Sequence, residues 1–211
     1  MDLAKKRPAH WSDVKAGLKN FDRQGLLDLV RDLYQASATN RRFLHARFVQ
    51  SSSTLDDYRR LVRDMVFPDP FSRRPIRLRE ATATIAEYRR STGDLVGSAD
   101  LMVEFVEAGT EQAADLGCGD DPYFSALERK VTEVMRLLRD LPDGARLAIA
   151  GRLIRLGEYR DSIGWGYGDF LGDTASQLEA RHPVQSVKQV VTPSKKRSQS
   201  AALRTSVTSR G

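Results

Sequence analysis

The spacing of apolar residues predicts α-helices along most of the chain. Through residues 22–180 large apolar side chains recur every three or four positions, which places them on one face of a helix. Asp22 is a suitable N-cap for the first helix, and Leu26, Val30 and Leu33 follow it at helical spacing. The predicted helices cover 22–34, 40–48, 54–66, 78–93, 94 or 98–116, 121 to the proline at 142, 149–163 and about 169–180.

Proline and glycine residues divide this pattern into separate elements. Residues 67–75 contain three prolines and are predicted to form a loop, while Gly93 and Gly117 are placed to end helices. No segment shows the two-residue alternation of a half-buried strand, and the nearest candidate, 185–191, is interrupted by polar residues. We therefore expect an all-α protein, either a single bundle or a helical-repeat-like stack of seven to eight helices.

The charge distribution separates a body from a tail. The chain has 34 basic and 28 acidic residues, but seven of the basic residues lie at or beyond Arg181, and no acidic residue follows Glu179. Without these seven, 27 basic residues stand against 28 acidic ones in residues 1–180. The tail is also poor in large apolar residues, so we expect a flexible N-terminus at 1–10, an all-helical domain at 11–180 and a disordered basic tail at 181–211.

Composition also limits the cellular location. A single cysteine, Cys118, cannot form a disulfide within the chain. No apolar run approaches the roughly 20 residues that span a bilayer, and the N-terminal residues lack the apolar segment of a secretory signal. The expectation is a cytoplasmic protein without a membrane partner.

One string, DLGCGDD at 115–121, resembles the glycine-rich loop of S-adenosylmethionine-dependent methyltransferases. In that motif a buried strand delivers an acidic residue and glycines to a tight turn beside the cofactor. Here the preceding residues, EAGTEQAA, continue a helical pattern, and no series of strands follows. We favour a helix that ends at Gly117 and another that begins with Asp121 as N-cap and Pro122 at the first helical position. The methyltransferase stays a remote, disfavoured alternative, and no cofactor is expected.

Two other segments are candidate interaction surfaces rather than catalytic sites. In RDSIGWGYGDF, glycines alternate with Trp165 and Tyr167 before Asp169, so the aromatic rings either close a helix corner or present a stacking surface. In NRRFLHARF, Arg41 and His45 share one helix face, most simply as a polar face opposite the phenylalanines. Three scattered histidines and one cysteine give no metal-ligand spacing, and we assign no catalytic residue and no metal.

The basic tail offers a separate hypothesis. Lys195, Lys196 and Arg197 can neutralise phosphates and give salt-dependent binding to nucleic acid without sequence preference. The tail has no aromatic residue to stack on bases, so a solvated tail without a dedicated partner is an equally good interpretation.

The segments HWSDVKAGLKNFDRQGLLDLVRDLYQAS, NRRFLHARF, RRPIR and RDSIGWGYGDFL together resemble a family of small, predominantly helical bacterial proteins of unknown function. The resemblance spans about residues 11–178 and implies a helical cytoplasmic protein, without an activity or catalytic residues to carry over. The leading functional hypothesis is a non-enzymatic helical module that binds a protein partner. Nucleic-acid association through the tail is the alternative.

Overall fold

The protein is all-α over the residues that the structure describes. The computed structural model describes residues 10–49, 53–117, 119–164 and 166–181. The predicted flexible N-terminus and basic tail, Lys195, Lys196 and Arg197 included, lie outside these residues, apart from His10 and Arg181. The α-helices are α1 (Trp11–Leu18), α2 (Arg23–Ala36), α3 (Ala38–Phe48), α4 (Ser53–Val66), α5 (Leu78–Thr92), α6 (Leu95–Leu116), α7 (Asp121–Leu137), α8 (Asp143–Leu156), α9 (Arg160–Ile163) and α10 (Tyr167–Arg181). Short 3-10 turns occupy Pro70–Ser72, Leu138–Asp140 and Gly157–Tyr159.

Several helix ends lie where the sequence predicts them. The Asp22 carboxylate accepts a hydrogen bond from the Gly25 N–H at 2.7 Å and caps α2. Gly93 and Gly117 follow α5 and α6 with φ of 70° and 61°, the left-handed conformation that glycine adopts without strain. The prediction for α7 was wrong by one residue.

The N-cap of α7 is Asp120, not Asp121. Its carboxylate accepts a hydrogen bond from the Tyr123 N–H at 2.9 Å, and Asp121 is the first helical residue. Both aspartates are good capping residues, so their order alone does not decide which one caps the helix. In the methyltransferase-like string, the residues before Gly117 are helical, and α7 begins at Asp121.

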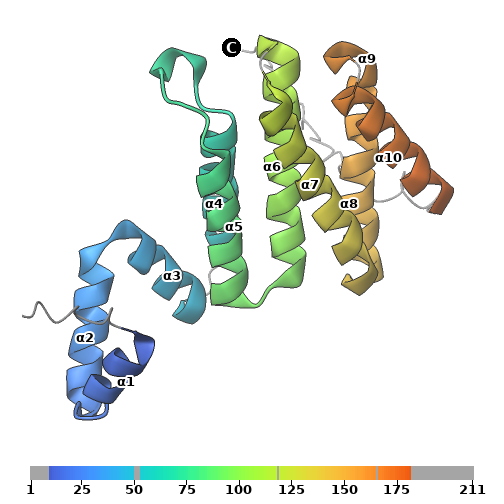
Figure 1. Ribbon diagram of the computed structural model, residues 1–211. Helices are drawn as coiled ribbons and strands as arrows, with labels where there is room; N and C mark the ends of the chain where they lie inside the picture. Colours follow the sequence, from blue (N-terminus) through green and yellow to red (C-terminus); the bar gives the residue numbers. More distant parts are fainter. Residues whose placement is uncertain (1–9, 50–52, 118, 165, 182–211) are drawn as a thin grey trace, which may run out of the picture.

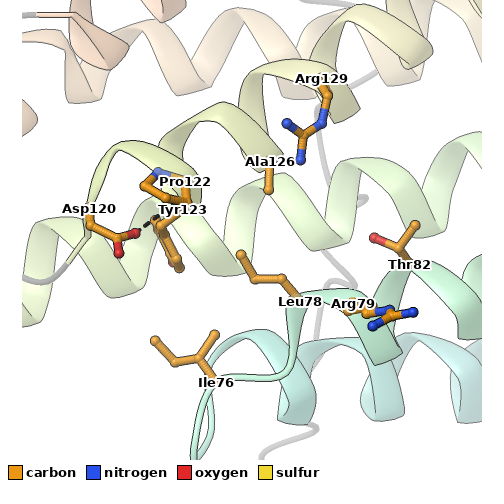
Figure 2. Close-up of a pocket in the computed structure, with 9 residues that line it drawn as sticks. All are labelled: Ile76, Leu78, Arg79, Thr82, Asp120, Pro122, Tyr123, Ala126 and Arg129. Carbon is orange, nitrogen blue, oxygen red and sulfur yellow. Dashed lines mark hydrogen bonds between the residues drawn. The ribbon is translucent and has the colours of Figure 1, made fainter.

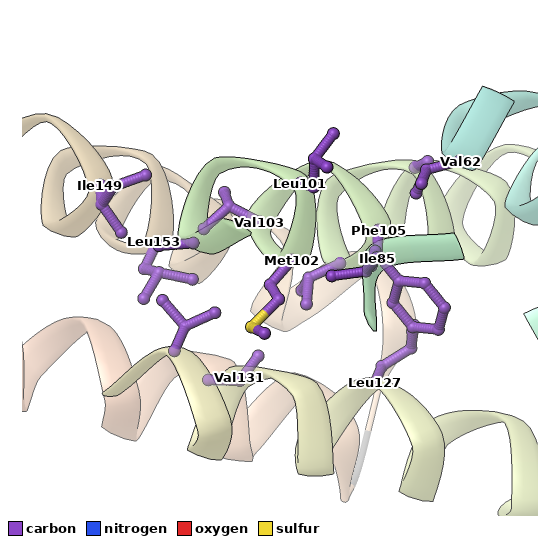
Figure 3. Close-up of a cluster of buried hydrophobic side chains, with 14 of the residues drawn as sticks. Val62, Ile85, Leu101, Met102, Val103, Phe105, Leu127, Val131, Ile149 and Leu153 are labelled. Atoms are coloured by element: carbon purple, nitrogen blue, oxygen red, sulfur yellow. The ribbon is translucent and has the colours of Figure 1, made fainter. Parts of the chain in front are cut away.

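Helix α6 is the centre of the bundle. It packs against α4, α5, α7 and α8, and Figure 1 shows it between the α4–α5 pair and the α7–α8 pair. Figure 3 shows Met102 and Phe105 of α6 among side chains from neighbouring helices, including Ile85, Leu127 and Val131. A helix that is buried on most of its circumference needs apolar residues on more than one face, and α6 has them.

Small residues let the helices approach closely. A Cβ atom on Gly109 of α6 would lie 2.5 Å from a methyl group of Leu127 on α7, which is too close for two carbon atoms. The Gly109 carbonyl also accepts a hydrogen bond of 2.7 Å from the Tyr123 hydroxyl. Glycine at position 109 therefore fixes the contact between α6 and α7.

The C-terminal helices differ from the predicted pattern. The predicted helix 149–163 is divided into α8, a 3-10 turn and the short α9. At Gly157, in the turn, an added Cβ would lie 2.7 Å from the Cβ of Ala175 on α10. The turn brings the chain against α10, and this packing ends the continuous helix.

The N-terminal helices lie at the edge of the molecule (Figure 1). Neither α1 nor α2 has a buried residue, and α1 was not predicted. Helix α3 connects them to the bundle through Ala46, which is buried, and through Arg42, whose guanidinium is 3.1 Å from the Glu87 carboxylate of α5. Within the described chain no helix is long and apolar enough to cross a membrane.

Candidate functional site

Exposed apolar residues gather on the first three helices. Of the thirteen large hydrophobic residues that are exposed in the described chain, nine lie between positions 11 and 49. We call these nine the N-terminal apolar surface, and the bundle contributes only four exposed large hydrophobics of its own. The surface consists of Trp11, Val14, Phe21, Leu26, Leu27, Val30, Leu33, Phe48 and Val49.

The exposed residues of α2 form the centre of its apolar face. Leu26, Val30 and Leu33 are spaced by four and three positions, so they lie on one side of the helix. Their exposed fractions are 41%, 42% and 49%. An amphipathic helix normally buries this side against a core, but here a large part of each of the three side chains stays exposed.

A groove between α2 and α3 continues this surface. It has a volume of about 400 Å³ and is mostly apolar, with Arg31 and His45 as its charged or polar members. Its other lining residues are Leu27, Val30, Tyr34, Leu44, Phe48 and Val49. The groove gives the N-terminal apolar surface a concave part, which suits an inserted side chain or helix.

Arg41 and His45 lie together on α3, as their spacing predicts. The His45 ring nitrogen Nε2 is 3.0 Å from the Tyr34 hydroxyl, and Arg41 donates a 3.4 Å hydrogen bond to the carbonyl of Gln35. Both contacts join α3 to α2 and hold the two helices as a hairpin. Their role in the structure is to position the groove, with the imidazole on its edge.

The other predicted surface, in residues 160–170, is only partly exposed, and its tyrosine is buried. Tyr167 is 3% exposed, and its ring stacks between Phe124 and Phe170 while its hydroxyl lies 2.8 Å from that of Thr110. Tyr167 is therefore a core residue and does not offer its ring to a ligand. Asp169 is half-exposed and accepts a hydrogen bond of 2.9 Å from Arg160.

Trp165 lies outside the described residues. Asp169 belongs to α10, which is at the opposite edge of the molecule from α3 in Figure 1. The structure therefore does not bring Tyr167 and Asp169 together with Arg41 and His45. The two predicted candidates are separate features.

A network of ion pairs joins α4, α6 and α8, and sequence reasoning missed it. Arg152 of α8 contacts three carboxylates of α6, with Nη1 2.6 Å from Asp100, Nε 2.9 Å from Glu107 and Nη2 3.3 Å from Glu104. Burial lowers the pKa of Arg152, but hydrogen bonding and charge attraction to Glu107, with Asp100 and Glu104, raise it above its usual value. The guanidinium stays charged and holds α8 against α6.

Arginines of α4 complete the network from the other side. Arg59 lies 2.7 Å from Asp100, and Arg63 lies 3.0 Å from Glu104 and also pairs with Glu111. The signal in the sequence is the row of acidic residues at 100, 104, 107 and 111, which follows one face of a largely apolar helix. All of these groups are paired with one another, so the network is a structural element of the bundle.

Another hollow lies between α5 and α7. It has a volume of about 520 Å³, and Figure 2 shows Leu78 and Ala126 in its middle, Arg79 and Arg129 at one end and Asp120 at the other. Asp120 already caps α7, and both arginines are exposed to solvent. The hollow can accommodate an apolar group with an anionic end, but its polar groups are not pre-organised by buried contacts.

Metal ligands and similarity to known proteins are the remaining guides to function. Among the described residues no group of three or more His, Cys, Asp or Glu side chains is arranged to hold a metal ion. No protein-family model matches the chain, and no curated protein or solved structure is significantly similar to it. The resemblance to helical bacterial proteins therefore stays a prediction.

Proposed function

We propose that this chain is a helical interaction module that binds a protein partner through the N-terminal apolar surface. The observation that carries the proposal is the concentration of exposed large apolar side chains on α1, α2 and α3. Contiguous apolar patches of this kind mark interaction sites on soluble proteins. The aromatic residues Trp11, Phe21 and Phe48 add the side chains that contribute most to binding at protein interfaces.

The helical hairpin of α2 and α3 is expected to be only marginally stable without a partner. An isolated helix of 14 residues is marginally stable in water, and α2 gains no stabilisation from a buried residue of its own. A partner that covers Leu26, Val30 and Leu33 removes their side chains from water. Binding therefore stabilises the same helices that form the surface.

Photo-crosslinking in the native host tests the proposal. A photoreactive amino acid replaces Val30, at the centre of the surface, and in a control strain it replaces Phe71, which is 94% exposed on the loop before α5. Irradiation is expected to give a covalent adduct with another polypeptide from position 30 and none from position 71. If position 30 gives no adduct, or no more than position 71, the surface does not bind a protein and the proposal fails.

The tail supports a second candidate function, binding to nucleic acid. Its basis is the seven basic residues from Arg181 onward without a single acidic residue. Each phosphate contact releases a counterion, so the affinity for duplex DNA is expected to fall steeply with salt. Deletion of residues 182–211 is expected to abolish both the binding and its salt dependence, and unchanged binding would reject this role of the tail.

A further inference from the structure

We propose that the hollow between α5 and α7 binds a small amphiphilic anion, that is, an apolar chain that ends in one carboxylate or phosphate group. In the complex the chain lies over Leu78 and Ala126, and the anionic end contacts Arg79 and Arg129. The site is on other helices than the N-terminal apolar surface, so it is independent of the proposed binding of a protein partner.

The first argument is the shape and lining of the hollow. Its volume of about 520 Å³ is within the range of roughly 300–1,000 Å³ in which proteins hold small molecules. Figure 2 shows Leu78 of α5 and Ala126 of α7 in its middle. The apolar lining is extended by Ile76, Pro122 and Tyr123. An apolar chain that displaces water from these carbon atoms is stabilised by the hydrophobic effect.

The second argument is the charge at one end of the hollow. Arg79 of α5 and Arg129 of α7 border this end (Figure 2), and within the described chain neither guanidinium has a carboxylate at ion-pair distance. Neighbouring cations do have such partners, because Arg77 and Lys130 each pair with an acidic residue three positions further along the chain. The hollow therefore offers two guanidiniums that the described residues do not neutralise.

The opposite end of the hollow fixes the direction of binding. Asp120 lies there, and its carboxylate accepts a hydrogen bond of 2.9 Å from the Tyr123 N–H as the N-cap of α7. An anionic group is repelled by this carboxylate and attracted to the arginines, whose planar arrays of N–H donors match carboxylate and phosphate oxygens. The lining thus selects an anionic chain over a cationic chain of the same length.

The size of this selectivity follows from the exposure of the two arginines. Both side chains are exposed, and an ion pair in water contributes little because solvent screens it and the side chains must be ordered. Two such contacts together are expected to favour the anion by about tenfold in dissociation constant. The proposal therefore predicts weak, reversible binding that depends on the charge of the ligand.

The experiment is a titration of the isotope-labelled full-length protein, followed by the NMR shifts of its backbone amides. The probes are decanoate, decyl phosphate and decyltrimethylammonium, each below the concentration at which it forms micelles. The two anions are expected to shift amides in residues 76–82 and 120–129, and the tighter of them identifies the preferred head group. Decyltrimethylammonium is expected to bind about tenfold more weakly than decanoate.

Arginine variants test the charged end. Arg79→Gln/Arg129→Gln is expected to raise the dissociation constant of decanoate about tenfold and to keep the wild-type thermal transition, because only exposed side chains change. The matched control is Arg89→Gln/Arg136→Gln. It removes the same charge from exposed positions of α5 and α7 that do not line the hollow, and it is expected to bind decanoate like the wild type.

A third variant, Ala126→Phe, fills the middle of the hollow and is expected to abolish the shifts in residues 76–82 and 120–129. The proposal is overturned if decanoate shifts no amide there, or only amides in residues 11–49. Equal affinity for decanoate and decyltrimethylammonium overturns it too, as does an equal loss of affinity in the two double arginine variants.

Discussion

Removal of Arg152 tests whether the ion-pair network holds the bundle together. Arg152 contacts Asp100, Glu104 and Glu107 and is the only cation within ion-pair distance of Glu107 among the described residues. Arg152→Met keeps the length of the side chain but leaves Glu107 unpaired. Asp100 keeps Arg59 and Glu104 keeps Arg63, so the loss is concentrated on one carboxylate.

The expected loss of stability follows from burial. Breaking a fully buried ion pair by removing one partner costs about 3–5 kcal/mol, whereas a fully exposed pair contributes about 0–1 kcal/mol. The side chains of Arg152 and Glu107 are 18% and 20% exposed, which places this pair nearer the buried limit. We expect Arg152→Met to lower the free energy of unfolding by about 2–3 kcal/mol.

The assay is urea unfolding followed by helical circular dichroism at one fixed protein concentration. The double variant Arg152→Met/Glu107→Gln is expected to recover part of the loss, because it removes the charge left without a partner. High salt is expected to change the loss only slightly, since partly buried pairs are weakly screened. A loss below about 0.5 kcal/mol, the usual effect of a surface substitution, would refute the assignment of the network as a structural element.

Two further predictions concern the core. Gly109→Ala is expected to destabilise the protein by about 1 kcal/mol in urea unfolding, because displacing Leu127 costs about 1–3 kcal/mol and helix propensity returns about 1 kcal/mol. Gly144→Ala, where an added Cβ meets no atom within 4 Å, is expected to be neutral or stabilising, and equal effects at both positions would contradict the packing argument. Burial above all raises the pKa values of Tyr58 and Tyr167 in the folded state. The contribution of the two protonated tyrosines to stability is therefore complete below the unfolded pKa of about 10, and it declines as the pH rises above that value. Tyrosine ionisation, measured by ultraviolet absorbance, should coincide with loss of the helical circular dichroism signal.

The fold could be predicted from the sequence to the level of its helices, because each depends on local spacing and local end signals. Apolar periodicity and residues such as Asp22, Gly93 and Gly117 act within one or two turns, and the structure confirms them. The short α1 was missed although Trp11 and Val14 are at helical spacing, since its N-cap is His10, an unusual residue for that position. Local signals also placed the N-cap of α7 at Asp121, one residue after the observed Asp120, because two adjacent aspartates offer equivalent capping groups.

The candidate site was harder to predict because it depends on contacts between distant segments. The sequence left open whether the Tyr167 ring packs inside a helix corner or presents a stacking surface. In the structure the adjacent Gly168 lets α10 approach the backbone of Arg160, and the ring of Tyr167 is buried. In the ion-pair network the acidic row on α6 was visible in the sequence. The positions of Arg59 and Arg152 opposite it were not, because helix packing decides which arginines face that row.

The N-terminal apolar surface shows what the spacing of apolar residues cannot predict. The stripe on α2 and the stripe on α4 have the same spacing, yet Val62 of α4 is fully buried and Val30 of α2 is 42% exposed. Folding and association bury apolar area by the same physical effect, so an apolar stripe predicts that a face will be covered without predicting what covers it. Charge provides the additional criterion, because it differs between possible partners where apolar area does not. Residues 11–49, which carry the surface, contain seven basic and four acidic residues, so its charge favours a partner with acidic residues over one with basic residues.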